Sequence, residues 1–340
     1  MPVRLYCRGW LPRQGFPRGD AALFKITASG YQRLQMNAGM IETRHWVLAI
    51  FIASALYVHF RGTVRFGLAR ALTDFTVLLA PVNAIMYLFS RTRRTAYIDP
   101  GEFPELAPLQ ANWQVIRDEA MALADGGQIR AASGYNDIGF NSFFRTGWKR
   151  FYLSWYGREL PSAMQSCPKT LALLKQIPTV KAAMFASLPP GATLVRHRDP
   201  YAGSLRYHLG LVTPNDPGCY IDVDGQSYHW RDGEAVMFDE TFIHHAANTT
   251  DHQRVVLFCD IERPLWTAPA RWFNRLFAKY VMATASSQNV EGESIGWLNR
   301  FFSVAYHLRV MGKKLKSSSR TTYYVAKWVA ISAVLWLIFW

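Results

Sequence analysis

Polar and apolar positions alternate strictly at 204–212, within a longer stretch of short strand-like segments from 180 to 264. Within 204–212, Arg206, His208 and Gly210 fall on one face of an extended backbone, and the apolar residues fall on the other. Pro-Gly, Asp-Pro-Gly and Asp-Gly turns separate the short segments of this stretch. The pattern predicts a mainly β fold whose core is a jelly roll, or double-stranded β-helix.

Helices are predicted on the N-terminal side of these strands. Residues 109–124 place Trp113, Ile116 and Ala120 on one face, which is typical of an amphipathic helix. Residues 169–177 predict a further helix. The jelly roll is therefore expected to carry flanking helices.

Two apolar runs precede these helices. The first, 46–60, would be roughly 22 Å long as a helix, short of the ~20 residues that a full membrane span needs. Arginines follow it, and the positive-inside rule then places the downstream chain in the cytoplasm. The second, 75–89, contains Pro81 and Asn83 and has arginines on both sides, which favours a segment that dips into the membrane interface.

The C-terminal part is predicted to be helical and basic. Residues 266–281 interleave aromatic and basic side chains, which suits either a headgroup layer or a helix packed on the barrel. Residues 309–327 contain basic residues and no acid, and the apolar tail 328–340 follows them. We expect terminal membrane-associated helices at both ends, including a transmembrane or one-sided C-terminal segment.

These patterns divide the chain into five parts. We expect a disordered or non-native extension at 1–39, with translation starting at Met36 or Met40. The other parts are N-terminal membrane-anchoring segments at 40–94, a catalytic domain at 95–265, a helical interfacial region with a basic collar at 266–322 and a hydrophobic membrane segment at 323–340.

Composition and charge narrow the choice of partners. The chain has 340 residues, of which 50% are hydrophobic, and 12 of them are tryptophans. The net charge of +14 is compatible with nucleic acid or with anionic lipid, and the apolar flanks favour lipid and a membrane over nucleic acid. The four cysteines show no metal-site spacing and suit a reducing compartment.

Three side chains in the strand-rich stretch predict a metal site. His197 and Asp199 are two positions apart, so both face the same side of a strand, and His244 precedes another strand. Two histidines and one carboxylate on one face of an octahedral ion are the ligand set of non-haem Fe(II) oxygenases. Structural zinc is instead closed by four ligands. We therefore expect iron at His197, Asp199 and His244.

The same cavity is predicted to bind a small anion. Arg206 and Arg254 come from two strands, and an unpaired guanidinium in a buried cavity is costly. A dicarboxylic keto acid meets this demand, with dioxygen as the remaining reactant. His208 by itself is typical of a hydrogen-bonded core histidine, whereas Arg206 beside it favours a cavity role. Asp260 is in phase with Arg254, and either orients the cavity or lies at the surface.

His245 and His252 are assigned no metal role. His245 follows His244 directly and points to the opposite face of a regular strand, and His252 falls in a turn.

Several motifs carry a resemblance to a known family. They are 205–211, 230–234, 238–244 and 254–260, with 147–151 and 167–170 upstream. Over roughly 110 to 265 the sequence resembles the aspartyl/asparaginyl β-hydroxylase family of 2-oxoglutarate dioxygenases. The segment 135–144 and the apolar ends resemble its bacterial membrane branch, which hydroxylates an acyl chain of lipid A.

The resemblance implies roles for individual residues. It gives His197, Asp199 and His244 as Fe(II) ligands and Arg254 as the partner of a 2-oxoglutarate carboxylate. Arg206 and His208 would hold 2-oxoglutarate near its other end. The animal peptide hydroxylases lack a carboxylate at the position of Asp199, so the resemblance is to the lipid branch.

This chain departs from the pattern of the peptide enzymes at one contact with the cosubstrate. The serine that makes this contact in the peptide enzymes corresponds to Ala186 here, with Ser187 next to it.

The expected function is hydroxylation of a lipid A acyl chain next to its carbonyl, at the cytoplasmic face of a bacterial inner membrane. The alternatives are a hydroxylase of another membrane lipid, such as an aminolipid, and an aspartyl or asparaginyl peptide β-hydroxylase. A cupin-like module that binds a metal or anion without turnover is the alternative that is not an enzyme.

Overall fold

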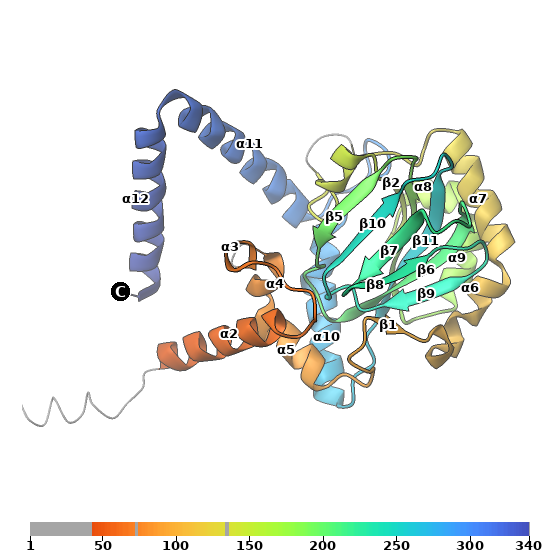
Figure 1. The fold of residues 1–340 in the computed structure, drawn as a ribbon, viewed down its shortest axis with the longest axis horizontal. Helices are drawn as coiled ribbons and strands as arrows, with labels where there is room; N and C mark the ends of the chain where they lie inside the picture. Colours follow the sequence, from red (N-terminus) through yellow and green to blue (C-terminus); the bar gives the residue numbers. More distant parts are fainter. Residues whose placement is uncertain (1–42, 72–73, 133–135, 340) are drawn as a thin grey trace, which may run out of the picture. The chain divides into compact units, whose positions relative to one another are not determined.

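Two antiparallel β-sheets form the centre of the protein (Figure 1). The computed structural model describes residues 43–71, 74–132 and 136–339. The predictions about 1–39 and about a start at Met36 or Met40 lie outside these residues. Residues 51–340 form one compact unit, and outside it only the first turns of helix α2 are described.

The strands are, in chain order, β1 Tyr97–Ile98, β2 Lys149–Trp155, β3 Arg158–Glu159, β4 Val180–Leu188, β5 Thr193–His197, β6 Ser204–Val212, β7 Cys219–Val223, β8 Gln226–His229, β9 Ala235–Phe238, β10 His244–Asn248 and β11 Arg254–Glu262. The α-helices are α2 Thr43–His59, α3 Leu68–Ala71, α4 Phe75–Leu78, α5 Ala80–Leu88, α6 Ala107–Ala111, α7 Trp113–Asp125, α8 Pro161–Ser166, α9 Pro168–Lys175, α10 Ala268–Tyr280, α11 Trp297–Ser318 and α12 Arg320–Phe339. Short 3-10 helices include η3 Phe143–Thr146 and η4 Met282–Ala285.

The strand order is that of a jelly roll. One sheet has the order β1-β9-β6-β11-β4-β2-β3, and the other has the order β5-β10-β7-β8. From β4 to β11 the chain passes back and forth between the two sheets, so strands distant in sequence become neighbours. This alternation defines a double-stranded β-helix, as the turn-broken strand pattern predicted.

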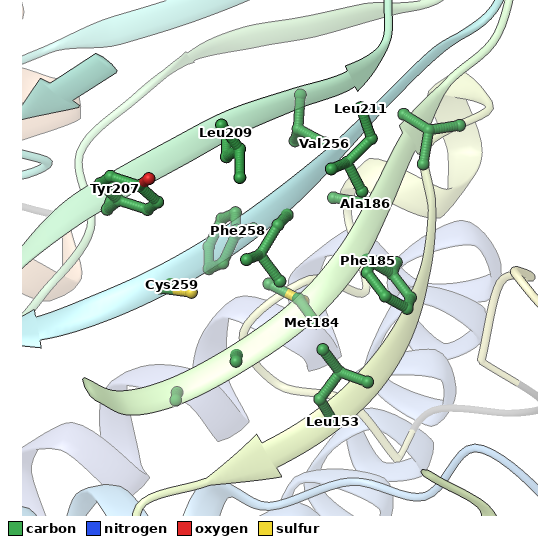
Figure 2. Close-up of a cluster of buried hydrophobic side chains, with 14 of the residues drawn as sticks. Leu153, Met184, Phe185, Ala186, Tyr207, Leu209, Leu211, Val256, Phe258 and Cys259 are labelled. Carbon is green, nitrogen blue, oxygen red and sulfur yellow. The ribbon is translucent and has the colours of Figure 1, made fainter. Parts of the chain in front are cut away.

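Side chains along the seven-stranded sheet alternate between a face toward the core and a face toward the cavity. Figure 2 shows apolar side chains of β4, β6 and β11, of which Phe185, Leu209 and Cys259 lie on the core face and Met184 and Phe258 on the opposite face. In the pairing of β6 with β11, Phe258 lies opposite His208 and Asp260 lies opposite Arg206. Polar side chains of both strands therefore share one face of the sheet.

One glycine of β6 is required by close packing. A Cβ at Gly210 would lie 2.0 Å from the backbone oxygen of Arg231, a distance that no side chain tolerates. The backbone nitrogen of Gly210 donates to Glu234, and the oxygen of Gly210 accepts from Gly233. Gly210 thus lets the 231–234 turn rest directly on the strand.

Helices cover the sheet and anchor its loops. The amphipathic helix predicted at 109–124 appears as α6 and α7, and α7 packs against β6 and α9 with Ile116 and Ala120 buried. On α5, the buried Asn83 donates to the oxygen of Pro200 at 2.8 Å and accepts from the nitrogen of Ala202 at 2.8 Å. Among the helices that the structure describes, none combines the length and apolarity needed to cross a bilayer.

Candidate active site

His197, Asp199 and His244 meet at one end of the four-stranded sheet. His197 ends β5, His244 begins β10, and the two residues are partners across these antiparallel strands. One nitrogen or oxygen atom from each of the three side chains lies within 4.8 Å of the others. The imidazole rings of the two histidines have centroids 4.1 Å apart. The structure therefore brings together the three residues that the sequence proposed as ligands.

Backbone carbonyls fix the tautomers of both histidines. Nδ1 of His197 lies 2.7 Å from the oxygen of Val195, and Nδ1 of His244 lies 2.9 Å from the oxygen of Phe242. A carbonyl only accepts, so Nδ1 is the donor in each ring and Nε2 keeps its lone pair. Burial lowers the pKa of His244 to about 3 and also lowers the pKa of His197. Both rings are therefore neutral, as metal ligation requires.

Asp199 is held by Arg206, which is itself surrounded by carboxylates. Nη2 of Arg206 lies 2.7 Å from Oδ2 of Asp199 and also contacts Glu240, and its Nε lies 3.0 Å from Oδ1 of Asp260. Phe258 lies beneath the guanidinium, with the ring centroid 3.6 Å from Cζ. Burial disfavours the charge of Arg206, but these carboxylates raise its pKa.

The protonation of this cluster follows from its burial. Three carboxylates surround one guanidinium, and burial raises the pKa of Glu240 well above its ordinary value. For Asp199 the attraction of Arg206 outweighs burial, so its pKa is lowered and it stays ionised. Tyr156 and Ser204 supply hydroxyls to Asp260 and Glu240 at 3.1 and 2.7 Å. The cluster thus aims a charged Asp199 at the two histidines.

Arg254 lies on the far wall of a narrow cavity between the two sheets. This inner cavity is lined by the three candidate ligands and by Ala186, His208, Trp230 and Arg254. Burial lowers the pKa of Arg254 to about 10, and none of the described carboxylates forms an ion pair with it. Its Nε and both ring nitrogens of His208 lack hydrogen-bond partners. The inner cavity therefore presents unpaired donors and one unpaired positive charge.

A second, larger cavity lies next to the inner one. This outer cavity has a volume of about 490 Å³ and shares His197, Asp199 and Arg206 with the inner one. Most of its remaining wall is apolar, and includes Phe66, Leu79, Phe143, Trp155 and Met282. His197 and Asp199 thus line both a small cavity that contains His244 and Arg254 and a large, mainly apolar one.

The comparisons identify the family. Residues 110–264 match the family described as aspartyl/asparaginyl β-hydroxylase. An ornithine lipid ester-linked acyl 2-hydroxylase from Rhizobium tropici is 31% identical over 238 residues, which are 69% of this chain and 84% of that protein. The chain belongs to the aspartyl/asparaginyl β-hydroxylase family. The resemblance proposed from the motifs is confirmed, and the chain is a hydroxylase of the 2-oxoglutarate dioxygenase type.

Other matches are more partial. Human aspartyl/asparaginyl β-hydroxylase is 29% identical over 168 residues, which are 48% of this chain but only 22% of that protein. Among solved structures, a Pseudomonas putida prolyl-4-hydroxylase aligns with 17% identity and a TM-score of 0.31, over 46% of this chain and 88% of that one. The fold assignment rests on the strand order and not on this low score.

The residues present fit the cofactors of this family. Two neutral imidazoles and one carboxylate are a donor set suited to Fe(II), and all three line the inner cavity, while His197 and Asp199 also line the outer one. The guanidinium of Arg254 has no carboxylate partner among the described residues, and the distal carboxylate of 2-oxoglutarate would supply one. The donor set and the positive charge therefore match the chemistry of both groups.

Sequence reasoning missed part of the site. Arg206 was expected to bind the cosubstrate, whereas the structure surrounds it with carboxylates, of which Glu240 was not singled out at all. Asp260, left open between cavity and surface, is buried against Arg206. The only signal for Glu240 was its place in the 238–244 motif. His245 and His252 lie outside the ligand cluster, and His252 is exposed.

Proposed function

We propose that this protein is an Fe(II)- and 2-oxoglutarate-dependent dioxygenase that hydroxylates an acyl chain of lipid A next to its carbonyl. The observation that carries the proposal is the position of His197 and Asp199 in the walls of two cavities, one that also contains His244 and Arg254, and an apolar one of about 490 Å³. A fatty acyl chain needs an apolar cavity of this kind.

Each residue of the inner cavity has a distinct task in this proposal. His197, Asp199 and His244 hold the iron, and the carbonyls on both Nδ1 atoms keep the rings oriented. Arg254 pairs with the distal carboxylate of 2-oxoglutarate, and the unpartnered ring of His208 donates to the same molecule. Bound iron and 2-oxoglutarate supply the oxidising power that converts a C–H bond into a C–OH bond.

Arg206 acts mainly on Asp199 in the proposed site. Its guanidinium bonds one carboxylate oxygen of Asp199 and leaves the other, Oδ1, beside Nε2 of His197 at 3.7 Å. Asp199 is thereby held in one orientation and cannot swing away from the histidines. The cosubstrate contact expected of Arg206 remains a secondary part of the proposal.

The identity of the lipid has two candidates. The basic collar at 309–327 suits the anionic phosphates of lipid A. The relative from Rhizobium tropici, named for ester-linked acyl 2-hydroxylation of ornithine lipid, supports an aminolipid instead. Both lipids share the acyl chain that the apolar cavity suits. The proposed location is the cytoplasmic face of a bacterial inner membrane, with apolar segments at both ends of the chain in contact with lipid.

The deciding experiment is mass spectrometry of total lipids from bacteria that lack the protein, express it, or express His197→Ala at equal level. A gain of one oxygen in lipid A, present only with the intact triad, is the expected result. A gain of one oxygen in ornithine lipid alone would mean that the substrate is the aminolipid. Unchanged lipids from cells whose purified protein still forms succinate from 2-oxoglutarate in a peptide mixture would favour a peptide hydroxylase. Absence of turnover with every substrate would favour a binding module.

A further inference from the structure

Two parts of the wall of the outer cavity come from outside the matched family domain. Residues 110–264 contribute the candidate ligands and buried aromatic side chains such as Trp155. The segment from Phe66 to Leu79 supplies one further wall, and Met282 and Ala285 on η4 supply another. The family domain alone therefore leaves this cavity open on two sides.

The exposure of the lining residues distinguishes the rim of the cavity from its floor. Leu78 and Ser142 are exposed and lie at the rim, where the exposed Arg70 also stands. Trp155 and Tyr201 are buried, and Met282 and Ala285 are half-buried beside them. Nε1 of Trp155 donates to the oxygen of Met282 at 2.8 Å, which fixes η4 against β2. The cavity thus has exposed residues at its rim, His197 and Asp199 in its wall, and η4 in the wall beside Trp155.

The chemistry of the reaction sets the direction in which a chain lies here. Hydroxylation next to the carbonyl leaves only the carbonyl carbon between the reacting carbon and the headgroup. The headgroup must then remain at the rim, and the rest of the chain must continue past His197 and Asp199 into the protein. Its methyl end would contact the part of the cavity farthest from the rim.

We propose that Met282 and Ala285 on η4 form the floor of an acyl-chain tunnel and determine the length of chain that the enzyme accepts. This inference rests on the proposed function and adds to it a specificity determinant outside the family domain. The occupant is a saturated acyl chain of a lipid whose anionic headgroup lies near Arg70. The tunnel explains why a lipid hydroxylase keeps segments on both sides of the shared catalytic domain.

Two substitutions test the floor in opposite directions. Ala285→Leu fills the tunnel and should lower hydroxylation of C16 chains relative to C10 chains by about tenfold or more, because one methylene in a closed apolar pocket has an effect of this size. Met282→Ala lengthens the tunnel and should raise the same ratio. Lipids of defined acyl length and the detergent-solubilised full-length protein are used for both.

Ala283→Leu is the matched control. Ala283 lies on the same 3-10 helix and is half-buried, but it is not on the cavity wall. Its ratio of C16 to C10 hydroxylation should equal that of the wild type. Retained activity on C10 chains shows that each variant is folded. Unchanged ratios in both Ala285→Leu and Met282→Ala would overturn the inference, as would an equal change in Ala283→Leu.

A binding measurement separates this inference from the proposed function. The fluorescence of cis-parinaric acid reports occupancy of an apolar tunnel without any turnover. If the wild type hydroxylates no lipid yet binds this probe, and Ala285→Leu weakens binding at least tenfold while Ala283→Leu does not, the tunnel stands and the proposed reaction falls. Equal binding by both variants, or no binding by the wild type, would overturn the tunnel.

Discussion

Arg206 and Arg254 are the same residue type in opposite electrostatic situations. Both are buried on the cavity face of the seven-stranded sheet, yet Arg206 contacts three carboxylates and Arg254 pairs with none of those described. A guanidinium without a partner lowers the stability of the empty protein and provides binding energy for an anion. Arg254 lies over the ring of Trp230 and has no carboxylate partner among the described residues.

Replacing Arg254 by glutamine should separate stability from cosubstrate binding. We expect KM for 2-oxoglutarate to rise about 100-fold, since a buried charge-assisted contact is lost. The free energy of unfolding of the cofactor-free protein should not fall, because an unpaired buried charge is removed. Steady-state kinetics and urea denaturation provide the two values. Arg231→Gln, at an exposed arginine paired with Glu234, is the control, and an unchanged KM in Arg254→Gln would contradict the assignment.

Side-chain alternation predicted the faces of the strands but not the contacts between them. The period of two correctly put Arg206 and His208 on the cavity side, because it depends only on local geometry. The contact of Arg206 with Asp260 joins residues 54 positions apart and depends on the register of β6 against β11, which no local pattern encodes. For the same reason Glu240 was overlooked.

At the scale of elements, a buried ion cluster joins the N-terminal segment to the loop before β10. Nη2 of Arg61, just after α2, lies 2.5 Å from Oδ2 of Asp239, and Nη2 of Arg263 lies 2.9 Å from the same oxygen. Thr241 donates to the other carboxylate oxygen of Asp239. The loop that holds Asp239 also holds Glu240 and leads to His244. The cluster therefore holds in place the loop that leads to His244.

Arg61→Met should lower the free energy of unfolding by about 3–5 kcal/mol, since it leaves Asp239 incompletely paired in the interior. Although burial opposes it, Arg263 and Arg61 hold the pKa of Asp239 below its ordinary value. The ionised Asp239 contributes this stability at neutral pH, and the contribution is lost progressively as pH falls below about 4. The difference in the free energy of unfolding between the variant and the wild type should therefore shrink at low pH. Urea denaturation at pH 7 and pH 3.5 measures it, with the exposed Arg65→Met as the control. Equal stability at pH 7 would refute the role of the cluster.

At the scale of the whole molecule, exposed apolar side chains gather where α5 ends and α10 begins. Leu88 is 71% exposed and Trp266 is 64% exposed, and the nitrogen of Trp266 donates to the oxygen of Phe89. Trp272 on α10 is also exposed, and Arg91 lies over the ring of Trp266. Tryptophan beside arginine is typical of a surface that rests in a lipid headgroup layer. α10 also packs on α5, as the second interpretation of 266–281 predicted, and the headgroup layer stays a prediction.

The double substitution Trp266→Ala with Trp272→Ala should weaken partitioning into vesicles of phosphatidylglycerol and phosphatidylcholine by about tenfold, because two aromatic anchors are removed. Co-sedimentation of the full-length protein measures the partition coefficient. Met164→Ala, which removes an exposed apolar side chain from α8, should leave it unchanged. Identical partitioning of the double variant and the wild type would exclude this surface from membrane contact.

The two hydrogen bonds of Asn83 to the 200–202 loop show that a functional fragment must include α5. Arg198, between two candidate ligands, likewise donates to the oxygen of Val58 at the end of α2. A fragment cut at residue 110, where the family match begins, would lose both supports of the segment that carries His197 and Asp199. A domain swap with another member of the family would therefore have to carry the chain from Val58 onward to keep these contacts.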